Sequence, residues 1–252
     1  MQGYTPVFDY AIHKFNTINN PETIFSSFRS QYEVYGFIDN GDNPHDEEAD
    51  TIARNTDIEL YQKYRDILSL RKNVGYENST STYAEYSNLD SRHIMMSVFL
   101  FANIKEPLNK IIEIGGGFGN WLFLNQKQSF NKWIIIDLPH VLQLQKWYLD
   151  NQNVNPELYT QISAFDNKKW ESGDLVIGSH SLSEFSFDVF YKYFEQIISK
   201  SKYFFYCYHN TMPSPDLINA KLLVINTKFT LISKTISENN NVSNCLFVSK
   251  NS

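Results

Sequence analysis

The segment EIGGGFG, residues 113–119, decides the fold of this chain. It closes the apolar run KIIEI, residues 110–114, and a helical pattern starts directly after it at Asn120. Glycine tolerates positive φ angles and carries no Cβ atom, so a ligand can approach the backbone of such a turn closely. The segment therefore predicts a strand, a ligand-binding turn and a helix within an α/β fold.

The spacing of the glycines and the acid favours one ligand class. The turn has the pattern E-x-G-x-G-x-G, with a further glycine inside it, and consists of Glu113, Gly115, Gly116, Gly117 and Gly119. A dinucleotide fingerprint needs its third glycine where Asn120 stands, and the Gly-Lys-Ser/Thr of a phosphate-binding loop is missing. A carboxylate here would repel a pyrophosphate but suits the ammonium and sulfonium of S-adenosylmethionine. We expect this cofactor, with S-adenosylhomocysteine as product; the alternative is a plain tight turn.

The pattern after residue 106 is an alternation of strands and helices. Further β-rich runs are expected at 132–137, 158–162, 174–179 and 202–208, with helices at 120–130, 141–151, 187–200 and 216–225. Such alternation predicts a parallel, doubly wound sheet with helices on both faces. Two last runs, 229–236 and 244–250, flank a polar turn and predict an antiparallel hairpin.

The first part of the chain is expected to be helical. Apolar residues recur at helical spacing in 58–70 and 91–104. The stretch 39–50 holds six acidic residues among Gly, Asn and Pro, and we expect a solvated linker there and no calcium loop. We therefore divide the chain into a helical cap that binds the acceptor, residues 1–105, and a cofactor-binding catalytic domain, residues 106–252.

Composition limits the partners. The formal net charge is -6, which argues against a protein that binds nucleic acid by neutralising phosphates. No window has the apolar length that crosses a bilayer, and the start lacks the basic and apolar stretches of a secretory signal. The two cysteines, Cys207 and Cys245, lie in apolar runs as buried thiols would. We expect a cytoplasmic protein without membrane insertion or nucleic-acid partner, and the sequence leaves homo-oligomerisation open.

Further cofactor contacts are expected at the carboxyl ends of the strands, where ligands bind in doubly wound sheets. Asp137 ends the second run roughly 20 residues past the glycines, where an acid can accept both ribose hydroxyls. Phe165 would lie on the adenine and Asp166 would accept its exocyclic amine, unless they are a loop aromatic and an exposed acid. The other expected cofactor residues are Leu138, Ala164 and Ser179.

Three segments together resemble a known family. They are EIGGGFGN (113–120), IIIDLPHVLQLQKWYL (134–149) and DLVIGSHSLSEFSFDVFYKYF (174–194). They are similar to the sugar O-methyltransferases of the class I methyltransferase fold, which is Rossmann-like. The resemblance implies a seven-stranded sheet of order 3-2-1-4-5-7-6 and a helical N-terminal region over the acceptor pocket. It also implies a sugar hydroxyl as acceptor, commonly a deoxyhexose such as rhamnose in a glycan or nucleotide-linked sugar.

Methyl transfer to a hydroxyl needs a base near the end of the fourth run. His180 is our expected base, since an imidazole titrates near neutral pH. Glu184 would orient that imidazole or hold a sugar hydroxyl; alternatively it is an acid favoured in the first turn of a helix. The segment SHSL stands where methyltransferases that act on base nitrogens usually carry Pro-Pro-aromatic, which favours a hydroxyl acceptor.

Acceptor contacts are expected from both halves of the chain. His209 and Asn210 end the fifth run and would bind the acceptor or help hold a divalent ion. An acidic pair for such an ion is not obvious, so we expect no metal. Aromatic and polar side chains suit a sugar, although packing between helices explains them equally well. The candidates before residue 105 are Tyr83, Arg92 and His93.

Three other functions stay open from the sequence. A methyltransferase for a small phenol or polyketide would share every cofactor residue. A module without catalysis, serving a glycosylation assembly, would bind S-adenosylmethionine without turnover. A dehydrogenase would bind NAD.

Overall fold

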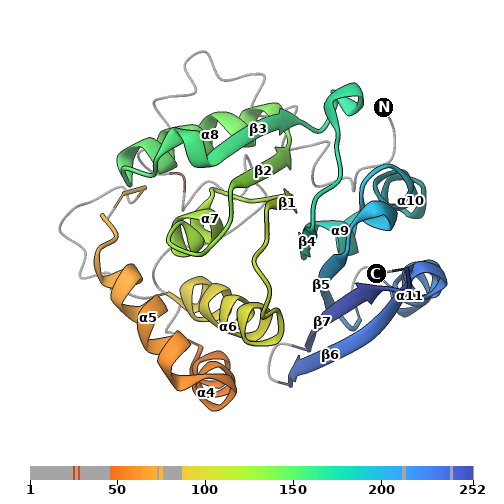
Figure 1. Ribbon diagram of the computed structural model, residues 1–252, viewed down its shortest axis with the longest axis horizontal. Coiled ribbons are helices and arrows are strands. Elements are labelled where there is room, and N and C mark those ends of the chain that lie inside the picture. Colours follow the sequence, from red (N-terminus) through yellow and green to blue (C-terminus); the bar gives the residue numbers. More distant parts are fainter. Residues whose placement is uncertain are drawn as a thin grey trace.

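The computed structural model describes Phe25, Phe28 and residues 46–72, 74–75, 87–211, 214–238 and 241–251 of the 252-residue chain. Its centre is a seven-stranded sheet of order β3-β2-β1-β4-β5-β7-β6 (Figure 1). β1 to β5 run parallel, whereas β7 is antiparallel to both β5 and β6. This confirms the α/β sheet expected from the sequence and the strand order that the resemblance implies.

The strands form where the sequence has its β-branched and aromatic runs. They are β1 (Lys110–Ile114), β2 (Lys132–Asp137), β3 (Tyr159–Ser163), β4 (Leu175–Ser179), β5 (Tyr203–His209), β6 (Phe229–Ser237) and β7 (Val242–Ser249). Nearly every residue of β1, β2, β4 and β5 is buried, as expected when helices cover both faces of a parallel sheet. Figure 1 shows α6 and α7 on one face and α10 and α11 on the other.

The helices connect these strands and precede them. They are α4 (Glu47–Thr56), α5 (Ile58–Ser69), α6 (Asn88–Asn103), α7 (Asn120–Asn125), α8 (Pro139–Asn151), α9 (Ser181–Glu184), α10 (Phe187–Gln196) and α11 (Pro215–Lys228), with 3-10 turns η2 (Pro156–Leu158), η3 (Asn167–Lys169) and η4 (Ile198–Lys200). The described residues before β1 are thus largely helical. α4 and α5 pack on α6, which packs on α7.

One expectation for the N-terminal region was wrong in the part that the structure describes, whereas residues 39–45 lie outside the described residues. The stretch 39–50 was expected to be a solvated linker, but its described part, from Asp46 on, begins a helix. Asp46 accepts a hydrogen bond from Ala49 N at 3.0 Å as the N-cap of α4, and Asp50 is buried. Acidic side chains stabilise a helix N-terminus through the helix dipole, so the acidic cluster marks a helix start.

Two helices end earlier than their apolar patterns predict. α7 ends at Asn125, before the expected end at residue 130, because Gln128 N donates to Asn125 O and begins the turn towards β2. α10 ends at Gln196 and continues as η4 after Ile197. Both changes bring the chain back to the sheet within a few residues.

Cys207 and Cys245 are buried and are not joined by a disulfide. Among the described helices, none has the length and apolar character needed to span a bilayer.

Candidate active site at the carboxyl ends of the central strands

The glycine turn after β1 has a conformation that only glycine adopts readily. Gly115 and Gly117 have φ angles of +77° and +56°. A Cβ atom on Gly115 would lie 2.3 Å from the Cβ atom of Ser181, so this glycine allows close packing against α9. A Cβ atom on Gly117 would meet no atom of the described residues within 4 Å, so on this side the described part of the turn is open to a ligand.

Asp137 ends β2 beside this turn. Its Oδ1 atom accepts a hydrogen bond from Leu138 N at 2.7 Å, and its Oδ2 atom accepts one from Gln145 Nε2 at 2.8 Å. Burial raises the pKa of Asp137 to about 7, although these bonds and the N–H groups of Gly116 and Gly117 lower it. The carboxylate is therefore held firmly, in an environment that resists its negative charge.

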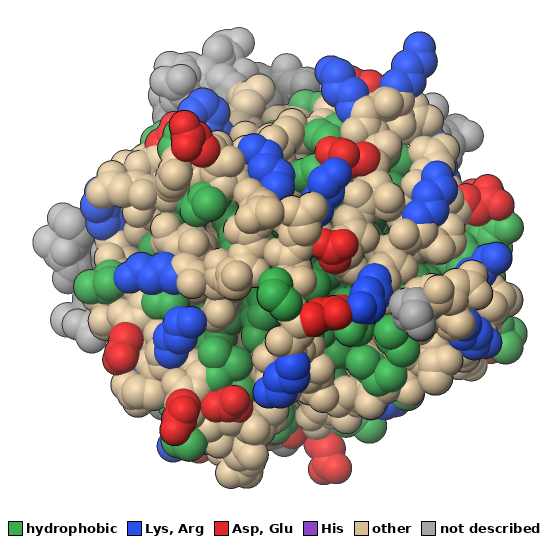
Figure 2. Space-filling view, viewed as in Figure 1, with side chains coloured by type: hydrophobic (Ala, Val, Ile, Leu, Met, Phe, Trp, Pro, Cys, Tyr) green, Lys and Arg blue, Asp and Glu red, His purple; other side chains and the backbone are tan. Residues whose placement is uncertain are grey.

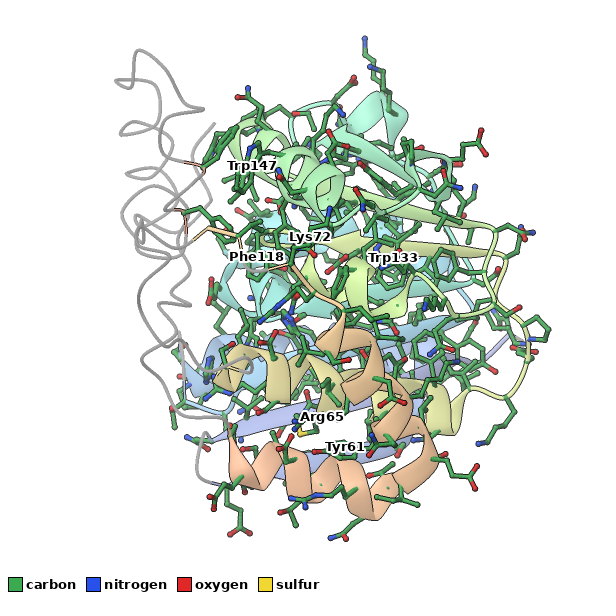
Figure 3. All side chains as sticks on the ribbon, turned by 90° about the vertical axis from the view of Figure 1, so that its left-hand side faces the viewer. Tyr61, Arg65, Lys72, Phe118, Trp133 and Trp147 are labelled. Atoms are coloured by element: carbon green, nitrogen blue, oxygen red, sulfur yellow. The ribbon has the colours of Figure 1, made fainter. Side chains whose placement is uncertain are left out.

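Glu113 is a second buried carboxyl group next to the turn. It is 2% exposed and accepts a hydrogen bond at 2.8 Å from the indole of Trp133, which lies in the interior of the molecule (Figure 3). Burial raises the pKa of Glu113 to about 8; the Trp133 bond lowers it and the charge of Asp137 raises it. Two carboxyl groups of raised pKa thus lie together at one turn.

These groups line a cavity of about 240 Å³. Eleven residues expected from the sequence line it: Glu113, Gly115, Gly116, Gly117, Asp137, Leu138, Ala164, Ser179, His180, Glu184 and His93. The sequence reasoning missed the others: Leu89, Phe118, Ile136, Val141, Ser181, Phe185 and Tyr193. Apolar residues predominate in this second group, and nothing in their local pattern separates a cavity wall from a packed core.

Several expected site residues lie elsewhere. Gly119 caps α7 and packs on Leu149. Phe165 is 41% exposed, and Asp166 pairs with Lys169 at 2.7 Å, so the loop reading of these two fits the structure. The Asn210 side chain donates a hydrogen bond to Asn241 and accepts one from Ser243. These hydrogen bonds connect the end of β5 to the start of β7. None of these residues lines the cavity, and Tyr83 lies outside the described residues.

Gln145 is a polar site residue that the sequence analysis overlooked. It is fully buried in α8, and its Nε2 atom also donates to Gly117 O at 2.8 Å. A signal was present, because Gln145 interrupts the apolar face formed by Val141, Leu144 and Tyr148. A buried amide at such a position needs partners, and here the partners are the turn and Asp137.

His180 connects β4 to α9 in a strained conformation, with φ at +62°. Its Nε2 atom lies 3.3 Å from the sulfur of Cys207, and its ring lies 4.9 Å from that of His209. Burial, together with the charges of His209 and Arg92, lowers the pKa of His180 to about 3. The imidazole is therefore neutral and a weak base in this structure.

Glu184 ends α9 and faces the cavity with a raised pKa. Burial raises the pKa of Glu184 to about 7, and the nearby Lys221 lowers it. Lys221 itself is fully buried and donates to the carbonyl oxygens of Leu182, Ser183 and Phe185 at 2.9, 2.8 and 2.6 Å. Lys221 thus fixes the C-terminal end of the short helix that carries Glu184.

α6 brings His93 to the cavity from the N-terminal side. The Nδ1 atom of His93 lies 3.0 Å from Asn120 Nδ2, which also donates to Asp90 Oδ1 at 3.0 Å. An amide N–H can only donate, so Nδ1 accepts and the proton of a neutral His93 is on Nε2. Burial lowers the pKa of His93 to about 4. Arg92 instead pairs with Asp46 at 3.1 Å.

Solved structures share this fold. A protein from Pyrococcus horikoshii matches with a TM-score of 0.53 and 14% identity, covering 68% of this chain and 93% of that one. A candidate RNA methyltransferase from Pyrococcus horikoshii has a TM-score of 0.53 and 12% identity, covering 75% of this chain and 98% of that one. No protein-family model and no curated protein matches the sequence. At these identities the likeness establishes the fold, the class I methyltransferase fold.

Proposed function

We propose that this chain is an S-adenosylmethionine-dependent O-methyltransferase. The observation that carries the proposal is the pair of buried carboxyl groups, Glu113 and Asp137, at an open glycine turn. Neither has an ion-pair partner among the described residues. Buried carboxylates are costly without a cation, and the cofactor carries two cationic groups, a sulfonium and an ammonium.

The residues present fit the cofactor. The open side of Gly117 would admit the close approach of its methionyl part, and Asp137 would accept hydrogen bonds from the ribose hydroxyls. Leu138, Val141 and Ala164 form an apolar wall of the cavity, where we place the adenine in preference to Phe165. The bound cofactor supplies an electrophilic methyl group, and this chain supplies its orientation and a dry cavity.

Glu184 is better suited than His180 to accept the proton. The acceptor oxygen forms a bond to the methyl carbon as the carbon–sulfur bond breaks, and the hydroxyl proton passes to a base. A base works best when its pKa lies near the operating pH, which favours a carboxylate near 7 over an imidazole near 3. We therefore assign general-base catalysis to Glu184 and a role in acceptor binding to His180.

A sugar hydroxyl is the acceptor class that we propose. Phe118, Phe185 and Tyr193 line the cavity, and aromatic side chains beside polar groups suit a sugar ring. Figure 2 shows Lys and Arg side chains interspersed with Asp and Glu over one face, without the basic patch that nucleic acid binding requires. Leu89 and His93 reach the cavity from α6, in line with an N-terminal region that caps the acceptor.

Incubation with methyl-labelled S-adenosylmethionine and a panel of glycans, nucleotide-linked sugars and catechols tests this function. We expect label in a sugar and none in catechols. Glu184→Gln should lose most turnover while keeping cofactor affinity, and His180→Ala should raise the acceptor KM more than it lowers kcat. Cofactor binding without transfer to any acceptor would favour a module without catalysis, and methylated catechols would favour the phenol alternative.

A further inference from the structure

A second, small cavity also has His180 in its wall. It has a volume of about 10 Å³, which is room for one water-sized group. Its walls are Arg92, Met95 and Met96 of α6, His180, and Cys207, Ser237, Val242 and Asn244 of the sheet. His180 lines both cavities, so the small one adjoins the place where the acceptor would meet the cofactor.

Asn244 is the unusual residue of this cavity. Its side chain is fully buried in β7, and neither its Nδ2 nor its Oδ1 atom has a hydrogen-bond partner among the described residues. Asn244 is paired with Cys207 of β5, so both side chains emerge on the same face of the sheet, next to the His180 ring. A buried amide without partners destabilises a fold, and Asn244 lines a cavity in which an occupant could supply the missing hydrogen bonds.

The other polar side chains of the cavity already have partners. Ser237 donates to a carboxylate oxygen of Glu48, and Arg92 pairs with Asp46. The carboxamide of Asn244 therefore offers a donor and an acceptor to whatever enters. A hydroxyl group complements it, since a hydroxyl also donates and accepts.

We propose that this cavity is an acceptor subsite in which Asn244 binds one hydroxyl of a vicinal diol while the neighbouring hydroxyl is methylated in the main cavity, beside His180. The volume admits a hydroxyl and no ring, so the ring of the acceptor stays in the main cavity. The inference rests on the proposed function and narrows it, because it requires two adjacent hydroxyls on the acceptor. A single ordered water is the competing occupant.

The test follows the side-chain carboxamide signal of Asn244 by NMR. That signal is assigned as the one that disappears in the Asn244→Leu variant. Protein saturated with S-adenosylhomocysteine is titrated with L-rhamnose and, separately, with catechol, two vicinal diols of different origin. We expect one of them to shift the carboxamide signal. The Asn244→Leu variant should weaken the binding of that diol, read from backbone signals of the main cavity, by about tenfold.

Tyr206→Phe is the matched control. Its hydroxyl, in β5 next to β7, is likewise buried and has no partner in the part of the chain that the structure describes, but it lines neither cavity. Both variants should keep or raise the melting temperature, and only Asn244→Leu should weaken diol binding. Equal weakening by Tyr206→Phe, or a carboxamide signal that neither diol moves, would overturn the subsite in favour of a structural water.

Two further measurements distinguish failure of the proposed function from failure of the subsite. Calorimetry reports whether S-adenosylhomocysteine binds at all, and the diol titration is repeated without it. A diol shift in protein that binds no S-adenosylhomocysteine would support the subsite and refute the methyltransferase.

Discussion

Gln145 donates a hydrogen bond of 2.8 Å to Asp137 Oδ2, and through the same nitrogen it holds Gly117 O at 2.8 Å. Its own Oε1 atom accepts a hydrogen bond from Gln161 of β3 at 3.1 Å. One buried amide thus fixes the acid at the end of β2 relative to the glycine turn after β1. Because the cofactor would touch both, this amide should determine how well they bind it together.

Gln145→Leu should lower the affinity for S-adenosylhomocysteine about tenfold or more, because Asp137 and Gly117 lose a shared donor inside the protein. Titration calorimetry measures the change. Gln143→Leu is the control, since Gln143 is exposed on the same helix and should leave affinity as it is. Unchanged affinity of Gln145→Leu for S-adenosylhomocysteine would show that Asp137 and Gly117 bind the cofactor without a shared hydrogen-bond donor.

Substitutions at Gly115 and Gly117 should have different effects on stability and on cofactor binding. The Cβ atom of Gly117→Ala would meet none of the structurally described atoms within 4 Å, so thermal unfolding should show a loss of only about 1 to 2 kcal/mol from the positive φ angle. The new methyl group should nevertheless block the cofactor. Gly115→Ala would place its Cβ atom 2.3 Å from Ser181, so its loss of stability should be clearly larger. Normal cofactor binding by Gly117→Ala would place the ligand elsewhere.

Cofactor affinity should increase with pH between about 6 and 9. The pKa of Asp137 is raised to about 7 and that of Glu113 to about 8, so both are partly protonated near neutral pH. A cationic ligand favours the ionised forms, so binding should release protons. Calorimetry in two buffers of different ionisation heat counts them, and Glu113→Gln should release fewer. Proton uptake on binding would have the wrong sign for this account.

The same two groups should make the unliganded protein less stable as pH rises. A carboxyl group whose folded pKa is raised binds its proton more tightly when folded, so stability falls from the unfolded pKa up to the folded one. The melting temperature should therefore decline between about pH 5 and 8, and Glu113→Gln should lessen that decline. A melting temperature that rises through this interval in the wild type would contradict the raised values.

Lys221→Met should destabilise the protein by about 1 to 3 kcal/mol, because three buried carbonyl groups lose their donor. It should also move the acidic limb of the pH profile of kcat/KM to higher pH, since the Lys221 charge lowers the pKa of Glu184. A merely structural role would leave the limb in place. Lys228→Met, at the exposed end of the same helix, should change neither quantity.

Local sequence patterns predicted the strands well and the site only in part. β1 and β2 match their expected bounds and β3, β4 and β5 lie within one residue of them, because β-branched and aromatic runs bounded by polar residues leave few alternatives. Periodicity could not give the strand order, which depends on contacts far apart in sequence.

Some side chains of the site could likewise be predicted from the sequence, and others could not. Glu113 and the glycines form one continuous motif, and Asp137 lies at the end of the next strand at a typical spacing from it, so the sequence reveals them. Gln145, Lys221 and Asn244 come to the site only through packing, and the environments of His180 and Glu184 depend on burial that no motif encodes. For that reason the sequence led us to expect His180 as the base, whereas the lowered pKa of His180 and the raised pKa of Glu184 lead us to propose Glu184.

A calorimetric titration with S-adenosylmethionine tests the central claim most directly, alongside NAD and the variant Asp137→Ala. The account predicts one binding site per chain for S-adenosylmethionine, loss of most affinity in Asp137→Ala, and no heat from NAD. Absence of binding by the folded wild-type protein, or binding of NAD in its place, would contradict it.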